Sequence, residues 1–296
     1  MATGALPHPS WIIWPCAILS VGLGYCAIYS RRRRASNEST TSRSNGSPNG
    51  IFGESDSGDD VVLCETPHPT WSPGQKQPPP EGLDGGHVEV NPRACKSCYS
   101  LVISAVTPRP IALVSTQAAD GTVNLAPFSY FNAMGHDPPT LAFSVCRKGD
   151  RGKKDTLLNI EASGEYVVSI MSDWFIEAAN HTCGGFPPEV DEMEAAGLTP
   201  AKSTIVAPPR VAESAVNMEC KVRHTYDIVN HKGDCTATVV FGEVVMFHVF
   251  PHLLNEAGAG EGKPTVNLKG YKPMARLGGS SYARLGSSFD LLRPSV

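Results

Sequence analysis

The stretch from Gly152 to Ile160 places a lysine, an aspartate and a threonine at the start of a predicted helix. The first N–H groups of a helix have no partner inside the helix, and the positive end of the helix dipole attracts anions. An ammonium group and a hydroxyl group at that position are donors that a phosphate requires. Lys154 and Thr156 are therefore candidate phosphate ligands, and Asp155 is the expected N-cap of the helix.

Further basic residues surround this start. They add positive potential near a bound anion, but a charged loop that only faces solvent has the same composition. For these residues the solvated loop is the favoured interpretation. They are Arg147, Lys148, Arg151 and Lys153.

The elements that must position this site are mostly strands. Alternating and β-branched runs predict strands at residues 111–116, 122–126, 140–146, 166–171, 214–227 and 235–250, with Asp120-Gly121 as a hairpin turn. Short helices are predicted at residues 99–106, 155–161 and 173–180, the last with Asp173 as its cap. Many strands and few helices favour a closed β-barrel with peripheral helices. No glycine-rich nucleotide fingerprint follows a strand, so a doubly wound sheet is not expected.

Three stretches in order along the chain resemble the flavin reductase-like family. They are residues 107–116, residues 124–132 followed by Asp137-Pro138-Pro139, and residues 152–160. The resemblance extends from Tyr99 to Leu285. It implies a mainly β fold, the FMN-binding split β-barrel with peripheral short helices, with FMN as cofactor and a homodimer as the assembly.

The resemblance also assigns residues to the flavin. Asn124, Ala126 and Ser129 are expected at the isoalloxazine ring and the ribityl chain, with Ser144 and Val145 beside them on the following strand. The alternative for Asn124 and Ser129 is the capping of a turn or bulge in the barrel wall. Phosphate contact by Lys154 and Thr156 agrees with the anion site above.

Two residues near the C-terminus are further candidates. Arg276 and Tyr282 belong to a stretch, residues 272–282, that is similar to an Arg-Leu-Gly-Gly…Tyr stretch of the family, which approaches the flavin in some members. The alternative is that both residues order a surface tail.

The chain departs from the family at one position. Several flavin reductases carry Gly-Asp-His at the start of the last long strand, and that histidine lies near the nicotinamide. Here the residues are Gly233-Asp234-Cys235, with His231 upstream. The departure puts the nicotinamide step in doubt and leaves the flavin site unaffected.

The function implied by the resemblance is that of an NAD(P)H-dependent flavin reductase. Hydride would pass from NADH or NADPH to flavin N5, and the reduced flavin would deliver electrons to oxygen, a free flavin or a protein partner. The cofactor supplies this chemistry and the protein orients it, so no catalytic residue is assigned. Two alternatives stay open, namely a flavoprotein oxygenase acting on a small molecule and a non-catalytic, membrane-tethered FMN-binding module.

Composition excludes other classes of protein. The net charge of the 296 residues is −4, which gives no indication of a nucleic-acid partner. The nine cysteines are odd in number and scattered, which is typical of a reducing compartment. Cys95 and Cys98 form a single pair without further ligands nearby, so no metal site is expected.

The N-terminus predicts a membrane anchor. Residues 11–29 are uncharged and apolar, long enough to cross a bilayer, and are followed by Arg31 to Arg34. The positive-inside rule then places the rest of the chain in the cytosol, at the endoplasmic reticulum or the mitochondrial outer membrane. The alternative is a cleaved or weakly inserted segment. We therefore divide the chain into an anchor with its basic flank (1–34), a disordered linker (35–84) and the flavin-binding domain (85–296).

Overall fold

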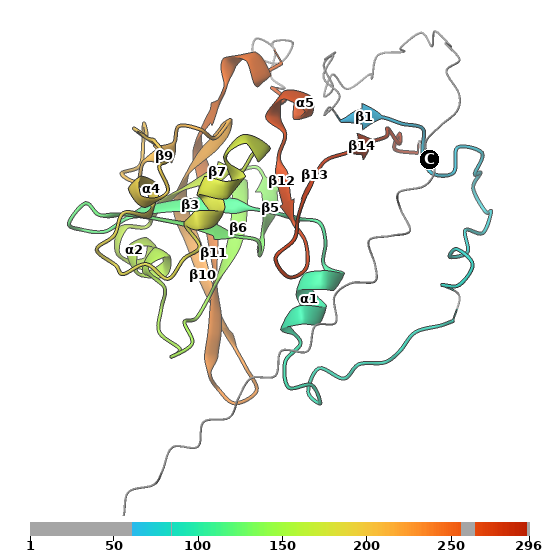
Figure 1. Ribbon diagram of the computed structural model, residues 1–296, viewed down its shortest axis with the longest axis horizontal. Helices are drawn as coiled ribbons and strands as arrows, with labels where there is room; N and C mark the ends of the chain where they lie inside the picture. Colours follow the sequence, from blue (N-terminus) through green and yellow to red (C-terminus); the bar gives the residue numbers. More distant parts are fainter. Residues whose placement is uncertain (1–60, 84, 256–263, 295–296) are drawn as a thin grey trace, which may run out of the picture. The chain divides into compact units, whose positions relative to one another are not determined.

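The computed structural model describes residues 61–83, 85–255 and 264–294. Its centre is a seven-stranded antiparallel sheet in the order β4-β3-β7-β10-β11-β6-β5 (Figure 1). The mainly β fold predicted from the sequence is therefore confirmed. The strands are β3 (Ala112–Gln117), β4 (Val123–Phe128), β5 (Phe131–His136), β6 (Pro139–Cys146), β7 (Glu165–Ile170), β10 (Val216–Val229) and β11 (Cys235–Val249).

The sheet curls around an apolar core. Phe128 of β4 and Phe143 of β6 lie on strands far apart in the sheet order, yet their ring centroids are 5.1 Å apart. Tyr166 of β7 packs edge-on against Phe143 at 5.3 Å and is fully buried. Because residues from opposite ends of the sheet share one core, the sheet forms the wall of a barrel.

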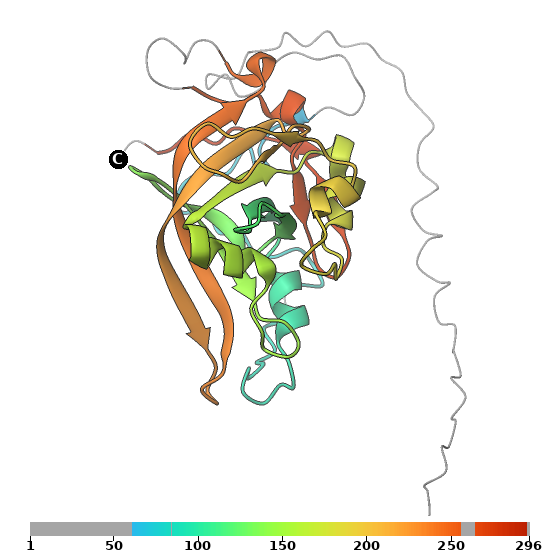
Figure 2. The same cartoon turned by 90° about the vertical axis from the view of Figure 1, so that its left-hand side faces the viewer.

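Helix α2 (Asp155–Ser163) packs beside the long β10–β11 ribbon (Figure 2). Leu157 and Ile160, spaced three residues apart on one helix face, are buried in the barrel core. Gly164 ends the helix in the left-handed conformation at φ 70°, which glycine adopts without steric cost. The packed face holds the helix on the barrel core, and the glycine cap fixes where the helix ends.

A second apolar cluster lies outside the barrel, between β3, β4 and a helical segment. We predicted one helix over residues 173–180 with Asp173 as its cap; the segment is helical as predicted, but the cap was wrong and the helix is divided into two parts. The segment is a 3₁₀ turn, η1 (Asp173–Phe175), followed by α3 (Ile176–His181), and Ser172 occupies the cap position. Asp173 instead pairs with Arg284 at 3.2 Å, so a tertiary ion pair takes the carboxylate that a cap would use.

The remaining elements are short. The sequence did not predict β5, which follows β4 after only two residues. β12 pairs with β2 and β13 in a three-stranded sheet. The elements are β1 (Val62–Leu63), α1 (Tyr99–Ala105), β2 (Arg109–Pro110), α4 (Glu192–Ala195), β8 (Pro200–Ala201), β9 (Arg210–Val211), η2 (Pro251–Leu253), α5 (Leu268–Tyr271), β12 (Met274–Arg276), β13 (Tyr282–Arg284) and β14 (Ser287–Ser288).

The apolar residues 61–63 differ from our expectation of a disordered linker over residues 35–84. Val62 and Leu63 form β1, which pairs in parallel with Ser287 and Ser288 of β14. Val61 is buried at 4% exposure. A strand ladder therefore begins inside the range that composition alone predicted to be disordered.

The predicted anchor at residues 11–29 lies outside the described residues. Within the described ranges, no helix is both long and apolar enough to span a membrane.

Candidate functional site

Two cavities adjoin the start of α2. The first has a volume of about 300 Å³ and the second about 430 Å³. Pro127, Phe128, Lys154 and Cys183 line both cavities, so the two are neighbouring parts of one groove.

The second cavity lies at the N-terminus of α2. The helix begins at Asp155, with Lys154 in the cap position and without a side-chain cap. Our expectation that Asp155 caps the helix was therefore wrong, and its carboxylate instead lies 3.4 Å from the amino group of Lys148. Because no side chain caps the helix, its first N–H groups remain available to a ligand in the cavity.

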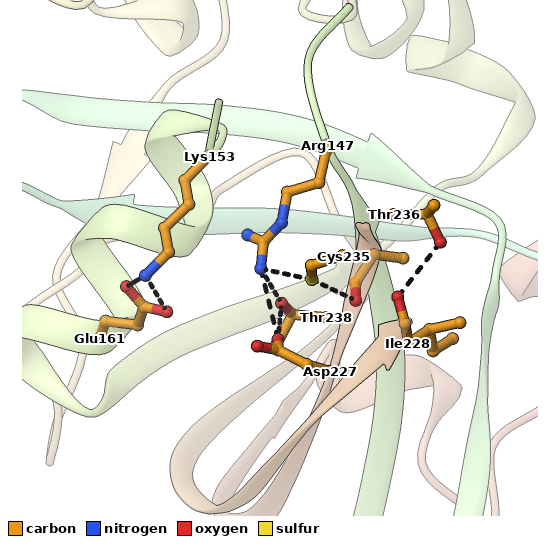
Figure 3. Close-up of polar contacts among 9 residues, drawn as sticks. Arg147, Lys153, Glu161, Asp227, Ile228, Cys235, Thr236 and Thr238 are labelled. Carbon is orange, nitrogen blue, oxygen red and sulfur yellow. Dashed lines mark hydrogen bonds and ion pairs between the residues drawn. The ribbon is translucent and has the colours of Figure 1, made fainter. Parts of the chain in front are cut away.

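The basic residues before α2 are neutralised by ion pairs, as Figure 3 shows for Arg147 and Lys153. Each pairs with a different acid. The side chains of Lys148, Arg151 and Lys153 are exposed, as expected for a solvated basic loop, whereas the Arg147 side chain is only 8% exposed and does not fit that interpretation. Lys154 differs, because its amino group has no hydrogen-bond or ion-pair partner among the residues that the structure describes. The pairs are Arg147 with Asp227 (3.3 Å), Lys148 with Asp155 (3.4 Å), Lys153 with Glu161 (2.6 Å), and Arg151 with Asp234.

Two side-chain hydrogen bonds hold α2 against the sheet. The amide of Asn124 on β4 donates to the hydroxyl of Thr156 at 2.9 Å, and both side chains are buried. One turn further along, the amide of Asn159 donates to Thr116 on β3 at 3.1 Å. The first bond lies in the wall of the second cavity and the second bond does not.

Glu192 on α4 also lines the second cavity, and the sequence analysis did not single it out. It is 8% exposed, and its carboxylate accepts a hydrogen bond from the Leu125 N–H at 3.0 Å. Burial raises the pKa of this carboxyl above its usual range, although the bond from Leu125 opposes the shift. No local pattern identifies Glu192, since it is 67 residues from its partner.

The first cavity is a slot with polar and aromatic walls. Ser129 and Ser144 lie on the barrel side, and Tyr99 of α1 lines the cavity as well. The wall from the C-terminal hairpin is Arg276 and Tyr282, with the guanidinium 4.4 Å from the centroid of the tyrosine ring. The tyrosine hydroxyl donates to Asn180 of α3 at 2.7 Å. The hairpin β12–β13 is thus fixed to α3 across the slot.

Arg109 is a further residue of the first cavity that we did not assign from the sequence. Its side chain is buried at 5% exposure. The guanidinium donates to the carbonyls of Ile103 (2.5 Å) and Leu277 (2.9 Å) and to the hydroxyl of Ser129 (3.3 Å). It therefore joins α1, the turn between β4 and β5, and the β12–β13 loop around the slot. The signal in the sequence was an arginine between two prolines in the first of the three motifs.

The structure brings nine of the ten predicted site residues to the two cavities. Val145 is the exception, since it is fully buried in the barrel core and lines neither cavity. Side chains alternate along β6, so Val145 faces inward where Ser144 faces the slot. Ser129, Ser144, Arg276 and Tyr282 line the first cavity, Asn124, Ala126, Asp155 and Thr156 the second, and Lys154 both.

The position of the family's nicotinamide histidine is occupied by Cys235, the first residue of β11. Arg147 donates a hydrogen bond to its sulfur at 3.0 Å, as Figure 3 shows. His231 lies in the preceding turn and is exposed. Neither residue lines the first or the second cavity.

Comparison with known proteins agrees with this geometry. Residues 104–268 match the family described as "Flavin reductase like domain". Uncharacterized proteins of Halalkalibacterium halodurans and Bacillus subtilis (YwrF) are each 38% identical, over 68% of this chain and 93% and 96% of theirs.

Two solved structures share the fold. Nitrilotriacetate monooxygenase component B from Bacillus cereus is similar with a TM-score of 0.65 and 34% identity, over 70% of this chain and 99% of that chain. The 2-nitrobenzoate 2-nitroreductase NbaA of Pseudomonas fluorescens is similar with a TM-score of 0.59 and 30% identity, over 71% and 96%.

Proposed function

This chain belongs to the flavin reductase-like family, and from that premise we propose that it is an FMN-dependent flavin reductase that takes hydride from NADH or NADPH. The observation that carries the choice of FMN is the unpaired amino group of Lys154, which lies at an uncapped helix N-terminus beside a polar slot.

The donors of the second cavity fit a phosphate group. Lys154 supplies a cation, the start of α2 supplies backbone N–H groups, and Thr156 adds a hydroxyl. Asn124 holds that hydroxyl in place by its hydrogen bond to Thr156. Two carboxyl groups in the lining of this cavity, Asp155 and Glu192, oppose an anion. Lys148 forms an ion pair with Asp155, and the raised pKa of Glu192 favours its neutral acid.

The first cavity fits the isoalloxazine ring. Ser129 and Ser144 present hydroxyls, while Phe128 and Tyr130 supply apolar surface. Bound flavin would supply hydride and electron transfer, and these residues would bind its ring and limit the access of water. Arg109 holds Ser129 and the carbonyl of Leu277, so it fixes two walls of the slot relative to each other.

The two solved relatives suggest two candidate electron acceptors. One of them is component B of a monooxygenase, which favours delivery of reduced flavin to a separate oxygenase protein. The other is a 2-nitrobenzoate 2-nitroreductase, which favours direct reduction of a small molecule. We propose delivery to an oxygenase as the leading function and direct reduction as the second candidate.

We also propose that two copies of the chain assemble over β5. The β5 groove, a largely apolar depression of about 250 Å³, includes Phe131, Met134 and Val239 in its lining. Tyr130 and Ser144 line both this groove and the first cavity. A second copy seated in the β5 groove would therefore also close one side of the slot.

The membrane anchor at residues 11–29 and the cytosolic orientation remain part of the proposal, supported by the length of the apolar run and by its basic flank. Removal of residues 1–34 should move the protein from the membrane pellet to the soluble fraction. A shortened protein that still sediments with membranes would contradict the anchor.

Anaerobic titration tests the proposed function. The purified protein is loaded with FMN, and NADH or NADPH is added under argon while the visible spectrum is recorded. We expect the flavin absorbance to bleach within seconds with one of the two donors. A yellow protein that neither donor bleaches would reject the reductase and favour the non-catalytic FMN-binding module.

A further inference from the structure

We infer that the first cavity is built to hold the anionic, two-electron-reduced form of the flavin more tightly than the oxidised form, through the charges of Arg109 and Arg276. The inference rests on the proposed function, because it assigns the isoalloxazine ring to this cavity. It goes beyond that function, because the proposed function alone does not predict which redox state of FMN the protein binds more tightly.

The charge of the cavity lining is the first observation. Its lining includes three cationic side chains, Arg109, Lys154 and Arg276, and no aspartate or glutamate. Lys154 also lines the second cavity, where the phosphate would neutralise it. Two positive charges are then left around the ring.

Arg109 is a buried charge without an acidic partner. The guanidinium donates to carbonyl oxygens of Ile103, Val106 and Leu277 and to the hydroxyl of Ser129, and all of these acceptors are neutral. Burial of a charge without a counter-ion is costly, and buried cations in proteins are ordinarily paired with an anion. Within the described residues the protein provides no such anion here, so a ligand that becomes negative in this cavity is favoured.

Arg276 is held in place by neutral groups as well. It lies 4.4 Å from the centroid of the Tyr282 ring and donates to the carbonyl of Gly279 at 2.7 Å. Arg284, two strand positions away on the paired β13, shows the contrast, because it forms an ion pair with Asp173 at 3.2 Å. Among the described residues, Arg284 outside the cavity thus has a counter-ion, and Arg276 in the cavity wall has none.

The chemistry of the ring connects these charges to the redox state. The oxidised isoalloxazine is neutral, whereas uptake of two electrons and one proton leaves a negative charge shared between N1 and the C2 oxygen. Fixed cations near this position stabilise the charge that develops there, and they do so strongly where water is excluded. Arg109 and Arg276 therefore favour the reduced anion and raise the reduction potential of bound FMN.

The test compares dissociation constants and potentials of FMN-loaded protein. Arg276→Gln removes one charge and keeps hydrogen-bonding capacity, and Arg284→Gln is the matched control on the neighbouring strand. For the native chain we expect reduced FMN to bind at least tenfold more tightly than oxidised FMN. This raises the two-electron potential above that of free FMN by about 30 mV or more, since a tenfold ratio corresponds to 29.6 mV. Arg276→Gln should lose most of this difference, and Arg284→Gln should retain it.

The pH dependence of the potential is a second readout, which needs only the native protein. One proton per two electrons gives a slope of about 30 mV per pH unit, and two protons give about 59 mV. We expect the shallower slope to persist in bound FMN to a lower pH than in free FMN. The inference would be overturned if the native protein bound oxidised and reduced FMN with equal affinity, or if the potential of bound FMN followed the steeper slope over the same pH range as free FMN. Either result would leave the proposed function standing. Failure to bind FMN at all would reject the proposed function itself.

Discussion

The side-chain amide of Asn124 donates a 2.9 Å hydrogen bond to the hydroxyl of Thr156, and both residues are buried where β4 meets the start of α2. This bond connects the second and third of the motifs that suggested the family. The second motif alone indicates the end of a strand, and the third alone indicates a helix start. Together they position the N-terminus of α2 at the second cavity.

Replacement of Asn124 tests that role. Asn124→Ala leaves the Thr156 hydroxyl without its buried partner, so we expect a loss of about 1–3 kcal/mol in the free energy of unfolding, measured by urea denaturation. Asn159→Ala is the matched control, because it removes the equivalent bond to Thr116 outside the cavities. Both variants should lose stability, but only Asn124→Ala should weaken FMN binding in calorimetry. Equal FMN affinity in the two variants would separate Asn124 from the flavin site.

Lys154 and Lys153 form a second matched pair. Lys153 is paired with Glu161 at 2.6 Å, whereas Lys154 lines both cavities without a partner among the described residues. Lys154→Gln should weaken FMN binding by about 1.5–3 kcal/mol, the range for a hydrogen bond to a charged group. Riboflavin lacks the phosphate, so its affinity should be unaffected. Lys153→Gln should leave both affinities unchanged, and a comparable loss in that variant would indicate general electrostatics instead of a phosphate contact.

Much of the fold was predictable because it depends on local pattern. The hairpin β3–β4 follows from two β-branched runs around Asp120-Gly121, and the structure pairs Ala112–Gln117 with Val123–Phe128. Strand β5 was missed because Met134 and Gly135 show no alternation, and its pairing with β6 comes from the tertiary fold. The cap of the helical segment at residues 173–180 was misassigned for a related reason, since the sequence cannot show that Asp173 would pair with Arg284.

The candidate site was predictable where a motif carried it. Lys154 and Thr156 were predicted from residue types at the start of a helix, and Asn124 was predicted from the family resemblance. Glu192 was not, because its role depends on a hydrogen bond to Leu125 across 67 residues. Arg109 was visible in a motif, but its burial and its contact with Leu277, 168 residues away, could only be read from the structure.

Gly242 on β11 is expected to resist substitution. A Cβ at this position would overlap the hydroxyl of Tyr166, which is fully buried in the barrel core. Gly242→Ala should therefore lower the thermal midpoint of unfolding, with a cost of about 1–3 kcal/mol typical of overpacking. Gly135→Ala on β5 meets only ordinary contacts and is the control. The double variant with Tyr166→Phe should regain part of the loss, and a purely additive result would show that the tyrosine is not the obstacle.

Glu219 predicts how stability depends on pH. Its carboxyl is fully buried, and burial raises its pKa, but hydrogen bonds from Thr204 N–H, His248, Ile205 N–H and Val206 N–H outweigh burial and bring the pKa to about 2. Because the folded pKa is below the ordinary value of 4.5 for a glutamate, ionised Glu219 stabilises the fold above about pH 4.5. This contribution should be lost as the pH falls from 4.5 toward 2.

Glu219→Gln provides the comparison. At pH 7 we expect it to be less stable than the native protein by about 3 kcal/mol, in line with the size of the pKa shift. The difference should shrink as acid protonates the native carboxyl. Unfolding free energies that run parallel between pH 7 and pH 3 would contradict the assignment.

The pairing of Val62 and Leu63 with Ser287 and Ser288 joins the two ends of the described chain. Any fusion partner, tag or surface attached directly after residue 288 would therefore begin next to β1. A protein shortened to begin at residue 85, as composition alone recommends, would leave β14 with an exposed, unpaired edge. Such a fragment is expected to associate through that edge, and residue 61 is the latest start that retains the ladder with its buried Val61.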